Sequence, residues 1–476
     1  MALRIGATTL AQRRYGFGLF RIATITPCHR LNRRLVLNMC FNTVNGTEFY
    51  RPLMRFLKEL PNDYIGTLAA VQAHHGDLVH WRLFGGLLNF AFISDATMNR
   101  ELFVRNRDAL AKVFSQVQTF LYAAGPSVAT AHGVDWQTKR KEANALFSRS
   151  VVEASCEGQV TVTQNYAATV REVPQDAILL ARRMAALTSS RGILGRTVSL
   201  AEADTQIAFS QAAADRFNAE SAQLFARPNW MLAPWRKELT RLKNKVSPMV
   251  QNAIEELRNS EVPNDGLMNH YVKGNFITSN DDEMLATFIG LLMGAQDNIA
   301  ATTAWVLAFL AQYPDVQIQI RNKVKGIGSH AQDLHSCALL KATIREVLRL
   351  RPPAPANQPR VLRMNVQIGG YELPKGTYVF NSFYNMHRDA AVFAKPGSFD
   401  PSRFLDGDLD SSPNFVPFGH GPRNCVAQGM AMQQVMAIVV GILRGNKVVA
   451  QQAALPEIEQ KPFLVPAPFK VLLERV

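Results

Sequence analysis

The chain has 476 residues, of which 47% are hydrophobic and 19% are charged. This composition supplies apolar material for a sizeable core and excludes a disordered or low-complexity chain. The five cysteines are scattered without a CxxC pair, which excludes a disulfide-stabilised secreted scaffold and a zinc finger and fits a reducing compartment. No apolar run of about 18 residues is free of charge, so we expect no transmembrane anchor.

The formal net charge of +14 is distributed unevenly. Seven arginines and no lysine precede the first acidic residue, Glu48. An Arg-rich, acid-free segment is typical of an organelle transit peptide, and a start upstream of the natural one is the alternative. We expect residues 1–47 to form a basic leader and residues 48–476 a single domain. The predicted location is the cytoplasm, or the mitochondrial or another organelle matrix if the leader is a transit peptide. No basic run interleaved with aromatic residues predicts nucleic-acid binding.

Beyond the leader, the residue pattern changes along the chain. Residues 80–94 predict two strands around Gly85-Gly86. Residues 134–350 are rich in Ala, Leu, Gln, Arg and Glu and predict a series of helices. Turns at Gly369-Gly370, a strand at 378–380, a helix after Cys425 and a strand at 463–476 follow. The mixture predicts one large, mainly α domain with small sheets at its edges.

A long, mostly apolar helix is expected at residues 284–310, where Gly294 is followed by the polar residues Gln296, Asp297 and Asn298. A Gly followed by polar residues in an apolar helix can open the backbone hydrogen-bond ladder and admit water. The segment therefore predicts a local interruption of this helix.

The segment from Phe418 to Cys425 is the most informative part of the sequence. Gly419, Gly421 and Pro422 exclude regular structure and predict a tight turn before the following helix. Cys425 then lies at or just before a helix N-terminus, where free N–H groups and the helix dipole stabilise a thiolate. A thiolate in apolar surroundings suits a soft or redox-active metal.

Four motifs together resemble the cytochrome P450 family. Phe418-x-x-Gly421-x-Arg423-x-Cys425 resembles its haem-binding signature, although Ala427 replaces the usual Gly two residues after the Cys. Three further matches lie in the family's order along the chain: Trp136-x-x-x-Arg140, Glu346-x-x-Arg349 and Pro401-x-Arg403-Phe404. The resemblance implies the cytochrome P450 fold, mainly α, a large helical domain with small β-sheets at one side.

The resemblance also implies roles for individual residues. Cys425 would be the axial ligand of the iron of haem b (iron protoporphyrin IX), with Phe418 packed against the sulfur or the macrocycle. Four residues would hold the haem propionates: Trp136, Arg140, Arg360 and Arg423. Three would form a structural triad that braces the cysteine loop: Glu346, Arg349 and Arg403.

By the same resemblance, Asp297 and Asn298 occupy the family's oxygen-activation motif, with Asn298 at the position where Thr is common. An amide cannot transfer a hydroxyl proton, but it can order a water that relays one. The leading interpretation is a monooxygenase that inserts one atom of dioxygen into its substrate. The alternatives are an isomerase or dehydratase of the same fold that acts on an oxygenated lipid without external reductant, and a non-catalytic haem sensor.

The resemblance implies a hydrophobic small-molecule substrate, lipid, terpenoid or steroid-like. Four segments are expected to line its cavity, at residues 114–122, 289–295, 356–361 and 464–465, and none indicates an anchoring charge for an acid or an amine. No flavin or iron–sulfur motif is present, so electrons would come from a ferredoxin- or flavodoxin-type donor. Lys139, Arg140 and Lys141 would face this acidic partner.

Overall fold

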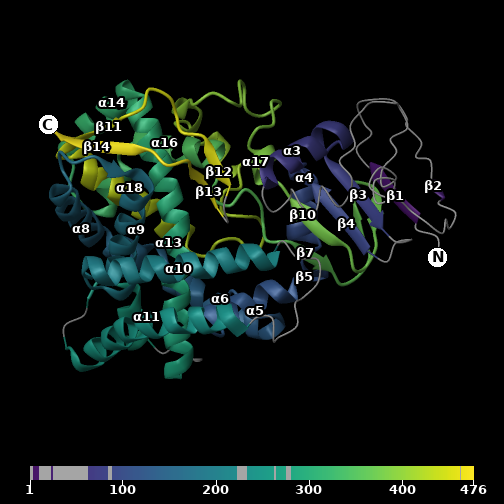
Figure 1. Cartoon of the computed structure of the whole chain (residues 1–476), viewed down its shortest axis with the longest axis horizontal. Coiled ribbons are helices and arrows are strands. Elements are labelled where there is room, and N and C mark those ends of the chain that lie inside the picture. The colour runs from purple at the N-terminus through teal and green to yellow at the C-terminus, as the bar shows by residue number, and fades with distance from the viewer. Residues whose placement is uncertain are drawn as a thin grey trace.

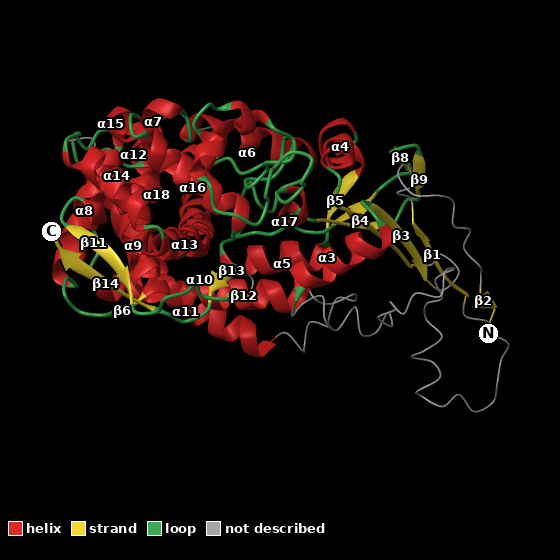
Figure 2. Ribbon diagram, turned by 90° about the horizontal axis from the view of Figure 1, so that it is seen from above, coloured by secondary structure: helices red, strands yellow, loops and turns green. Residues whose placement is uncertain are grey.

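The computed structural model describes residues 4–9, 23–24, 63–83, 88–221, 233–261, 264–274, 280–460 and 463–476. A body of packed helices makes up most of it, and the largest sheet and the C-terminal sheet lie at opposite ends of this body (Figure 1, Figure 2). The predicted mainly α fold with small sheets is therefore confirmed. Most of the predicted leader and the Gly85-Gly86 turn lie outside the described residues.

The helical prediction for residues 134–350 is confirmed by an almost continuous series of helices. The α-helices are α3 (Tyr64–His75), α4 (Ala96–Arg100), α5 (Phe114–Ala123), α6 (Gly133–Leu146), α7 (Arg149–Ala154), α8 (Cys156–Thr169), α9 (Ala177–Leu194), α10 (Leu200–Ser221), α11 (Ala233–Asn259), α12 (Leu267–Lys273), α13 (Asp281–Gln312), α14 (Pro314–Lys325), α15 (Ala331–His335), α16 (Ala338–Leu350), α17 (Phe383–Met386) and α18 (Gln428–Leu443).

The strands form one large sheet and three small ones. The large sheet has the order β2-β1-β3-β4-β10-β7-β5, and the predicted strands within 80–94 are its β3 and β4. Its strands are β1 (Arg4–Thr9), β2 (Ala23–Thr24), β3 (Leu78–Leu83), β4 (Leu88–Ile93), β5 (Leu110–Lys112), β7 (Arg360–Leu362) and β10 (Tyr378–Asn381). In the first small sheet, β14 (Lys470–Arg475) lies between β11 (Asn446–Ala450) and β6 (Gln175–Asp176). The other two pair β12 (Ile458–Gln460) with β13 (Leu464–Pro466) and β8 (Val366–Ile368) with β9 (Tyr371–Leu373).

Helix α13 runs through the helical body and packs along α9 (Figure 1). The Asn280 side chain accepts a hydrogen bond from the Glu283 N–H, and three acidic residues in the first turn complement the helix dipole. These two features start the helix at Asp281. The helix is long and apolar enough to cross a membrane by length and composition alone. However, 61% of its apolar 18-residue stretch is buried inside the protein, as in the core helix of a globular domain.

The predicted interruption of α13 at residues 294–298 is wrong, because the helix is continuous from Asp281 to Gln312. Asn298 Nδ2 donates to the Gly294 carbonyl oxygen at 3.1 Å. The polar side chain therefore bonds along the helix instead of opening its backbone ladder.

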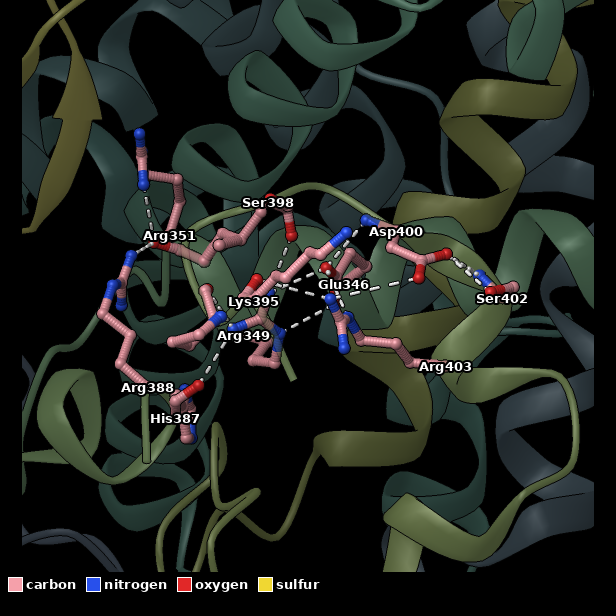
Figure 3. Close-up of polar contacts among 12 residues, drawn as sticks. Glu346, Arg349, Arg351, His387, Arg388, Lys395, Ser398, Asp400, Ser402 and Arg403 are labelled. Carbon is pink, nitrogen blue, oxygen red and sulfur yellow. Dashed lines mark hydrogen bonds and ion pairs between the residues drawn. The ribbon is translucent and has the colours of Figure 1, made fainter. Parts of the chain in front are cut away.

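A buried ion pair on α16 fixes the segments that lead to the cysteine loop (Figure 3). Glu346 and Arg349 are both fully buried, and Arg349 donates to the Glu346 carboxylate from Nε at 2.7 Å and from Nη2 at 2.8 Å. Arg403 Nε lies 3.5 Å from the same carboxylate. The remaining Arg349 donors bind the carbonyl oxygens of His387, Pro396 and Ser398. Each group of the pair is thus desolvated but satisfied.

His387 extends this arrangement toward the cysteine loop. The Val416 N–H donates to His387 Nε2 at 3.0 Å. Complete burial, with Arg388 and Arg349 close by, lowers the pKa of His387 to about 3. The imidazole is therefore neutral at physiological pH, and its hydrogen bond to Val416 does not change over that range.

We predict that Glu346→Gln destabilises the fold strongly, because it leaves the Arg349 guanidinium buried without a counter-charge. The expected loss in the free energy of unfolding is about 3–5 kcal/mol, measured by denaturant titration. Glu238→Gln is the matched control, since Glu238 pairs with Arg241 on the surface and its loss should leave the transition midpoint unchanged. Equal losses in the two variants would contradict a bracing role for the buried pair.

Candidate active site

The loop that precedes α18 is shaped by two glycines in the left-handed region, Gly419 at φ 84° and Gly421 at φ 73°. A Cβ on Gly421 would lie 2.2 Å from the Phe103 carbonyl oxygen, so no other residue fits there. The Cys425 N–H donates to the Phe418 carbonyl oxygen at 2.8 Å and closes the loop. The sequence pattern of this segment thus has a steric cause: the backbone passes too close to its neighbour for a side chain.

Cys425 differs from the other described cysteines. Cys156 and Cys337 are buried, and desolvation raises the pKa of both thiols, that of Cys156 to about 12. The Cys425 side chain has accessible surface although protein atoms surround it. Burial raises its pKa, against the opposing effects of a hydrogen bond from the Ala427 amide and the charge of Arg140. The loop alone does not ionise this thiol, whereas a bound metal ion would displace its proton.

Arginines from the loop and from α6 lie beside Cys425. Arg140 donates to the backbone carbonyl and the side-chain oxygen of Asn424, each at 2.7 Å. The Arg423 guanidinium carbon lies 4.2 Å from the centre of the Trp136 ring. The structure therefore brings Trp136, Arg140 and Arg423 together around the cysteine loop, from two segments far apart in the sequence.

Strands β5 and β7 add two further cations. Lys112 lies opposite Arg360 in the antiparallel β5–β7 pair. Burial and the charge of Arg423 lower the pKa of Arg360 to about 10. Burial, Arg423 and Arg360 lower the pKa of Lys112 to about 7. His132, at the start of α6, has its pKa lowered by desolvation and by the same cations. Among the described residues, no carboxylate pairs with Lys112, Arg360 or Arg423 in an ion pair.

This charge distribution fits the two carboxylates of haem. One buried and two partly buried cations that lie close together require an anion to compensate them. Haem supplies two carboxylates for these cations and an iron for the Cys425 thiolate. Sequence reasoning missed Lys112 and His132. A single lysine in the apolar strand Leu110–Lys112 was the available signal, but only the pairing of β5 with β7 brings it to Arg360.

Helix α13 carries Asp297, which is buried. Burial raises the pKa of this carboxyl to about 6, helped by the negative charge of Asp215 and opposed by Arg182. Arg182 Nε on α9 lies 3.8 Å from Asp297 Oδ1, beyond hydrogen-bond distance, so the pair is loose. The sequence analysis did not predict that Arg182 belongs to the site. The available signal was the pair of adjacent arginines, Arg182 and Arg183, inside an Ala- and Leu-rich helix.

Asn298 follows Asp297 and is only partly buried. Its Nδ2 bonds to Gly294, while the Thr302 hydroxyl donates to the Asn298 carbonyl oxygen at 2.9 Å. The side-chain oxygen of Asn298 can therefore accept a hydrogen bond from a water, and its second amide hydrogen can donate one.

The structure thus has a loop that presents one thiol among cations without carboxylate partners in the described residues, and a long core helix with a buried acid. This combination is typical of a haem-thiolate protein. Comparison with known proteins gives the same class. The family model for cytochrome P450 matches residues 53–473, and the chain belongs to the cytochrome P450 family. Members of this family are monooxygenases that use haem as cofactor.

Individual relatives match only parts of the chain. Human cytochrome P450 2U1 is 30% identical over 264 residues, which cover 50% of this chain and 48% of the relative. The steroid 17-alpha-hydroxylase/17,20 lyase of Felis catus is 34% identical over 204 residues, 40% of each chain. The matched segments thus span about half or less of these relatives. A solved structure described as retinoic acid bound cyanobacterial CYP120A1 superposes with a TM-score of 0.73 at 19% identity, over 87% of this chain and 95% of that chain, which shows the shared fold.

We predict that Cys425→Ala abolishes the thiolate–haem absorption band of the reduced carbonyl complex, because no other described cysteine combines an accessible thiol with the neighbouring cations. Cys337→Ala is the control and should retain the band, since Cys337 is buried elsewhere in the core. Survival of the band in Cys425→Ala would contradict the assignment of the ligand.

Proposed function

We propose that this protein is a haem-thiolate monooxygenase that inserts one atom of dioxygen into a hydrophobic small molecule, with electrons from a separate donor. The observation that carries the proposal is the meeting of an accessible Cys425 thiol with buried and partly buried cations that lack carboxylate partners among the described residues. In this proposal Cys425 ligates the haem iron, Phe418 packs beside the sulfur, and the haem supplies the activation of dioxygen.

The haem propionates are assigned to the cations around the loop. Trp136 and Arg140 on α6, Arg360 on β7 and Arg423 in the loop are the predicted partners, and Lys112 is added here. Because the pKa of Lys112 lies at about 7, a nearby propionate would hold this amine in its charged form.

Asp297 is proposed to supply protons that the activation of dioxygen by haem would require. A carboxyl with a pKa of about 6 exchanges protons readily near neutral pH, as a group in a proton relay must. Asn298 is proposed to hold the last water of the relay through its remaining amide hydrogen and its side-chain oxygen.

The proposal of an apolar substrate is supported by the descriptions of two relatives. Two relatives are described as acting on or binding apolar molecules, a steroid in one case and retinoic acid in the other. The predicted lining segments map to α5, to α13, to the region before and into β7, and to β13. A lipid, terpenoid or steroid-like substrate remains the proposal.

The electron donor is proposed to be of the ferredoxin or flavodoxin type, but α6 offers it less charge than expected. Lys139 is mostly buried and pairs with Asp135 at 3.6 Å and with Glu283 at 3.5 Å. Arg140 is engaged by Asn424. Of the three predicted cations only Lys141 is exposed, so an acidic donor would meet one cation of this helix rather than three.

The proposal also covers the division of the chain into domains and the cellular compartment of the protein. Residues 48–476 are proposed as one haem domain behind a basic leader, in the cytoplasm or an organelle matrix. Residues 4–9 of the predicted leader form β1, which pairs with β3; a leader that is removed would therefore expose the edge of β3.

An isomerase or dehydratase is the second candidate, favoured by Asn298 at the usual Thr position. Turnover that requires both an electron donor and dioxygen supports the monooxygenase, and turnover without either supports the second candidate. Steady consumption of reductant in the presence of substrate excludes a haem sensor.

We predict that the pH profile of product formation has a limb near pH 6 set by Asp297. The residue donates a proton only when protonated, so the rate falls as pH rises through its pKa. Asp215→Asn removes the negative charge that raises this pKa and should move the limb to lower pH. Asp297→Asn should lower the rate about 100-fold and remove the limb. A limb that is unchanged in both variants would contradict the proposed relay.

A further inference from the structure

A groove between α8, α9 and the start of α10 takes no part in the proposed reaction. It encloses a cavity of about 520 Å³, a volume typical of small-molecule sites. Helices α8 and α9 pack against each other at one end of the helical body (Figure 1). None of the described residues that line the groove belongs to the Cys425 loop, α6, α13, β5 or β7. The groove is therefore separate from the candidate active site.

Helix α8 presents two adjacent rows of residues to the groove. The outer row is polar and exposed, and it consists of Glu157, Thr161, Asn165 and Thr169. The inner row consists of Gly158, Val162 and Tyr166. Residues four apart lie on one face of a helix, and the outer row extends about 18 Å at 1.5 Å per residue. The groove thus has a long polar edge beside its floor.

The floor and the opposite wall of the groove are largely apolar. Val162 and Tyr166 on α8 and Leu187 on α9 are buried. Leu200, the first residue of α10, is 44% exposed and adds apolar surface at the rim. The groove can therefore remove the apolar part of a ligand from water.

The polar edge offers hydrogen-bond acceptors. The Thr161 hydroxyl donates to the Glu157 carbonyl oxygen at 2.9 Å, and the Thr169 hydroxyl donates to the Tyr166 carbonyl oxygen at 2.8 Å. Each hydroxyl hydrogen is thus used within α8, and the hydroxyl oxygens are left to accept. The Glu157 carboxylate on the same edge is also an acceptor. An edge of acceptors suits a ligand that brings positive charge.

Two carboxylates and one guanidinium line the groove, which gives it a net charge of −1. Arg191 donates to both carboxylate oxygens of Asp265 and to the Gly195 carbonyl oxygen, so Arg191 and Asp265 neutralise each other. Glu157 has a single ion-pair contact in the described part of the chain, with His330 Nδ1 at 3.7 Å, which is too long for a hydrogen bond. Glu157 is therefore the charge that remains for a ligand.

Other acids strengthen the negative charge at this end of the groove. Desolvation and three carboxylates raise the pKa of the buried Cys156 thiol to about 12, and Arg444 opposes this rise. The carboxylates are those of Asp333, Glu153 and Glu157. Next to Glu157, the acids thus outweigh the cation.

We propose that this groove binds a molecule with an apolar body and a positively charged amino or ammonium group. The body lies on Val162, Tyr166 and Leu200, and the charged group lies near Glu157. A ligand with a carboxylate is disfavoured, because Asp265 already holds the one guanidinium of the groove. The inference goes beyond the proposed function, since it depends neither on haem nor on turnover.

Phenylbutyltrimethylammonium is the probe, because a quaternary ammonium has no lone pair with which to ligate a haem iron. Its affinity for the haem-loaded protein is measured by calorimetry at low salt, and the ferric haem spectrum is recorded on the same samples. We expect binding that leaves the spectrum unchanged. Thr161→Trp fills the groove from α8 and Leu200→Trp fills it from α10, and each should weaken binding at least about tenfold. Ala168→Trp is the control, since Ala168 is exposed on α8 but does not line the groove, and it should leave binding unchanged.

The role of charge is tested with Glu157→Gln and with a neutral analogue of the probe in which carbon replaces the nitrogen. The variant should weaken the ammonium ion about three- to fivefold, an effect that high salt reduces, and leave the affinity for the neutral analogue unchanged. Glu256→Gln, at an exposed position of α11, is the control and should change neither affinity.

The two Trp variants reach the groove from different helices, and their thermal transitions are recorded to show that each is folded. No binding of the ammonium ion, equal affinities of a folded Trp variant and the unaltered protein, or equal effects of Glu157→Gln on the two probes would overturn the proposal. Binding that shifts the haem spectrum and survives in both Trp variants would place the probe at the haem instead, and would also overturn it.

Discussion

The accumulation of partly and fully buried positive charge around the Cys425 loop is the constraint on which the rest of the structure depends. Lys112 and Arg360 face each other across β5 and β7, and Arg423 adds a third charge from the loop itself. Desolvation lowers the pKa values of Lys112 and Arg360, and the charge of Arg423 lowers both further, so the scaffold holds these cations together against their repulsion. A dianionic cofactor removes this repulsion and converts it into affinity. The thiol responds to the same ligand, because its burial favours the protonated form until a metal ion replaces the proton.

The two sides of the site are built in opposite ways. On the cysteine side, Glu346, Arg349 and the neutral His387 are fully buried with hydrogen bonds to charged or backbone groups, so that wall is held in place by satisfied polar groups. On the α13 side, Asp297 is buried with only a distant cation, Arg182, and with the charge of Asp215 acting on it. A fixed wall suits the support of a metal ligand, and a loosely compensated carboxyl suits the movement of protons.

Features set by neighbouring residues could be predicted from the sequence, whereas features set by distant partners could not. The turn at Gly419 and Gly421, the i, i+3 pair on α16 and the Trp136–Arg140 face of α6 are local, and the structure places each beside the residues that the motifs indicate. Lys112, Arg182 and the pairing of Lys139 with Glu283 depend on tertiary contacts between segments far apart in the chain, and periodicity carries no information about them. The prediction of an interruption in α13 was wrong for a further reason. Gly and polar residues lower the stability of a helix, but the Asn298 side chain donates a hydrogen bond to the Gly294 carbonyl oxygen within the same helix, which offsets this loss of stability.

The central claim is that the cations around Cys425 exist to hold the two carboxylates of the cofactor. It is tested most directly by reconstituting the cofactor-free protein with haem and with haem dimethyl ester, which has the same macrocycle and iron but no free carboxylates. The account predicts that haem binds at least about a hundredfold more tightly than the diester, since several charge-assisted hydrogen bonds are lost. Equal affinities of the protein for the two compounds would contradict it.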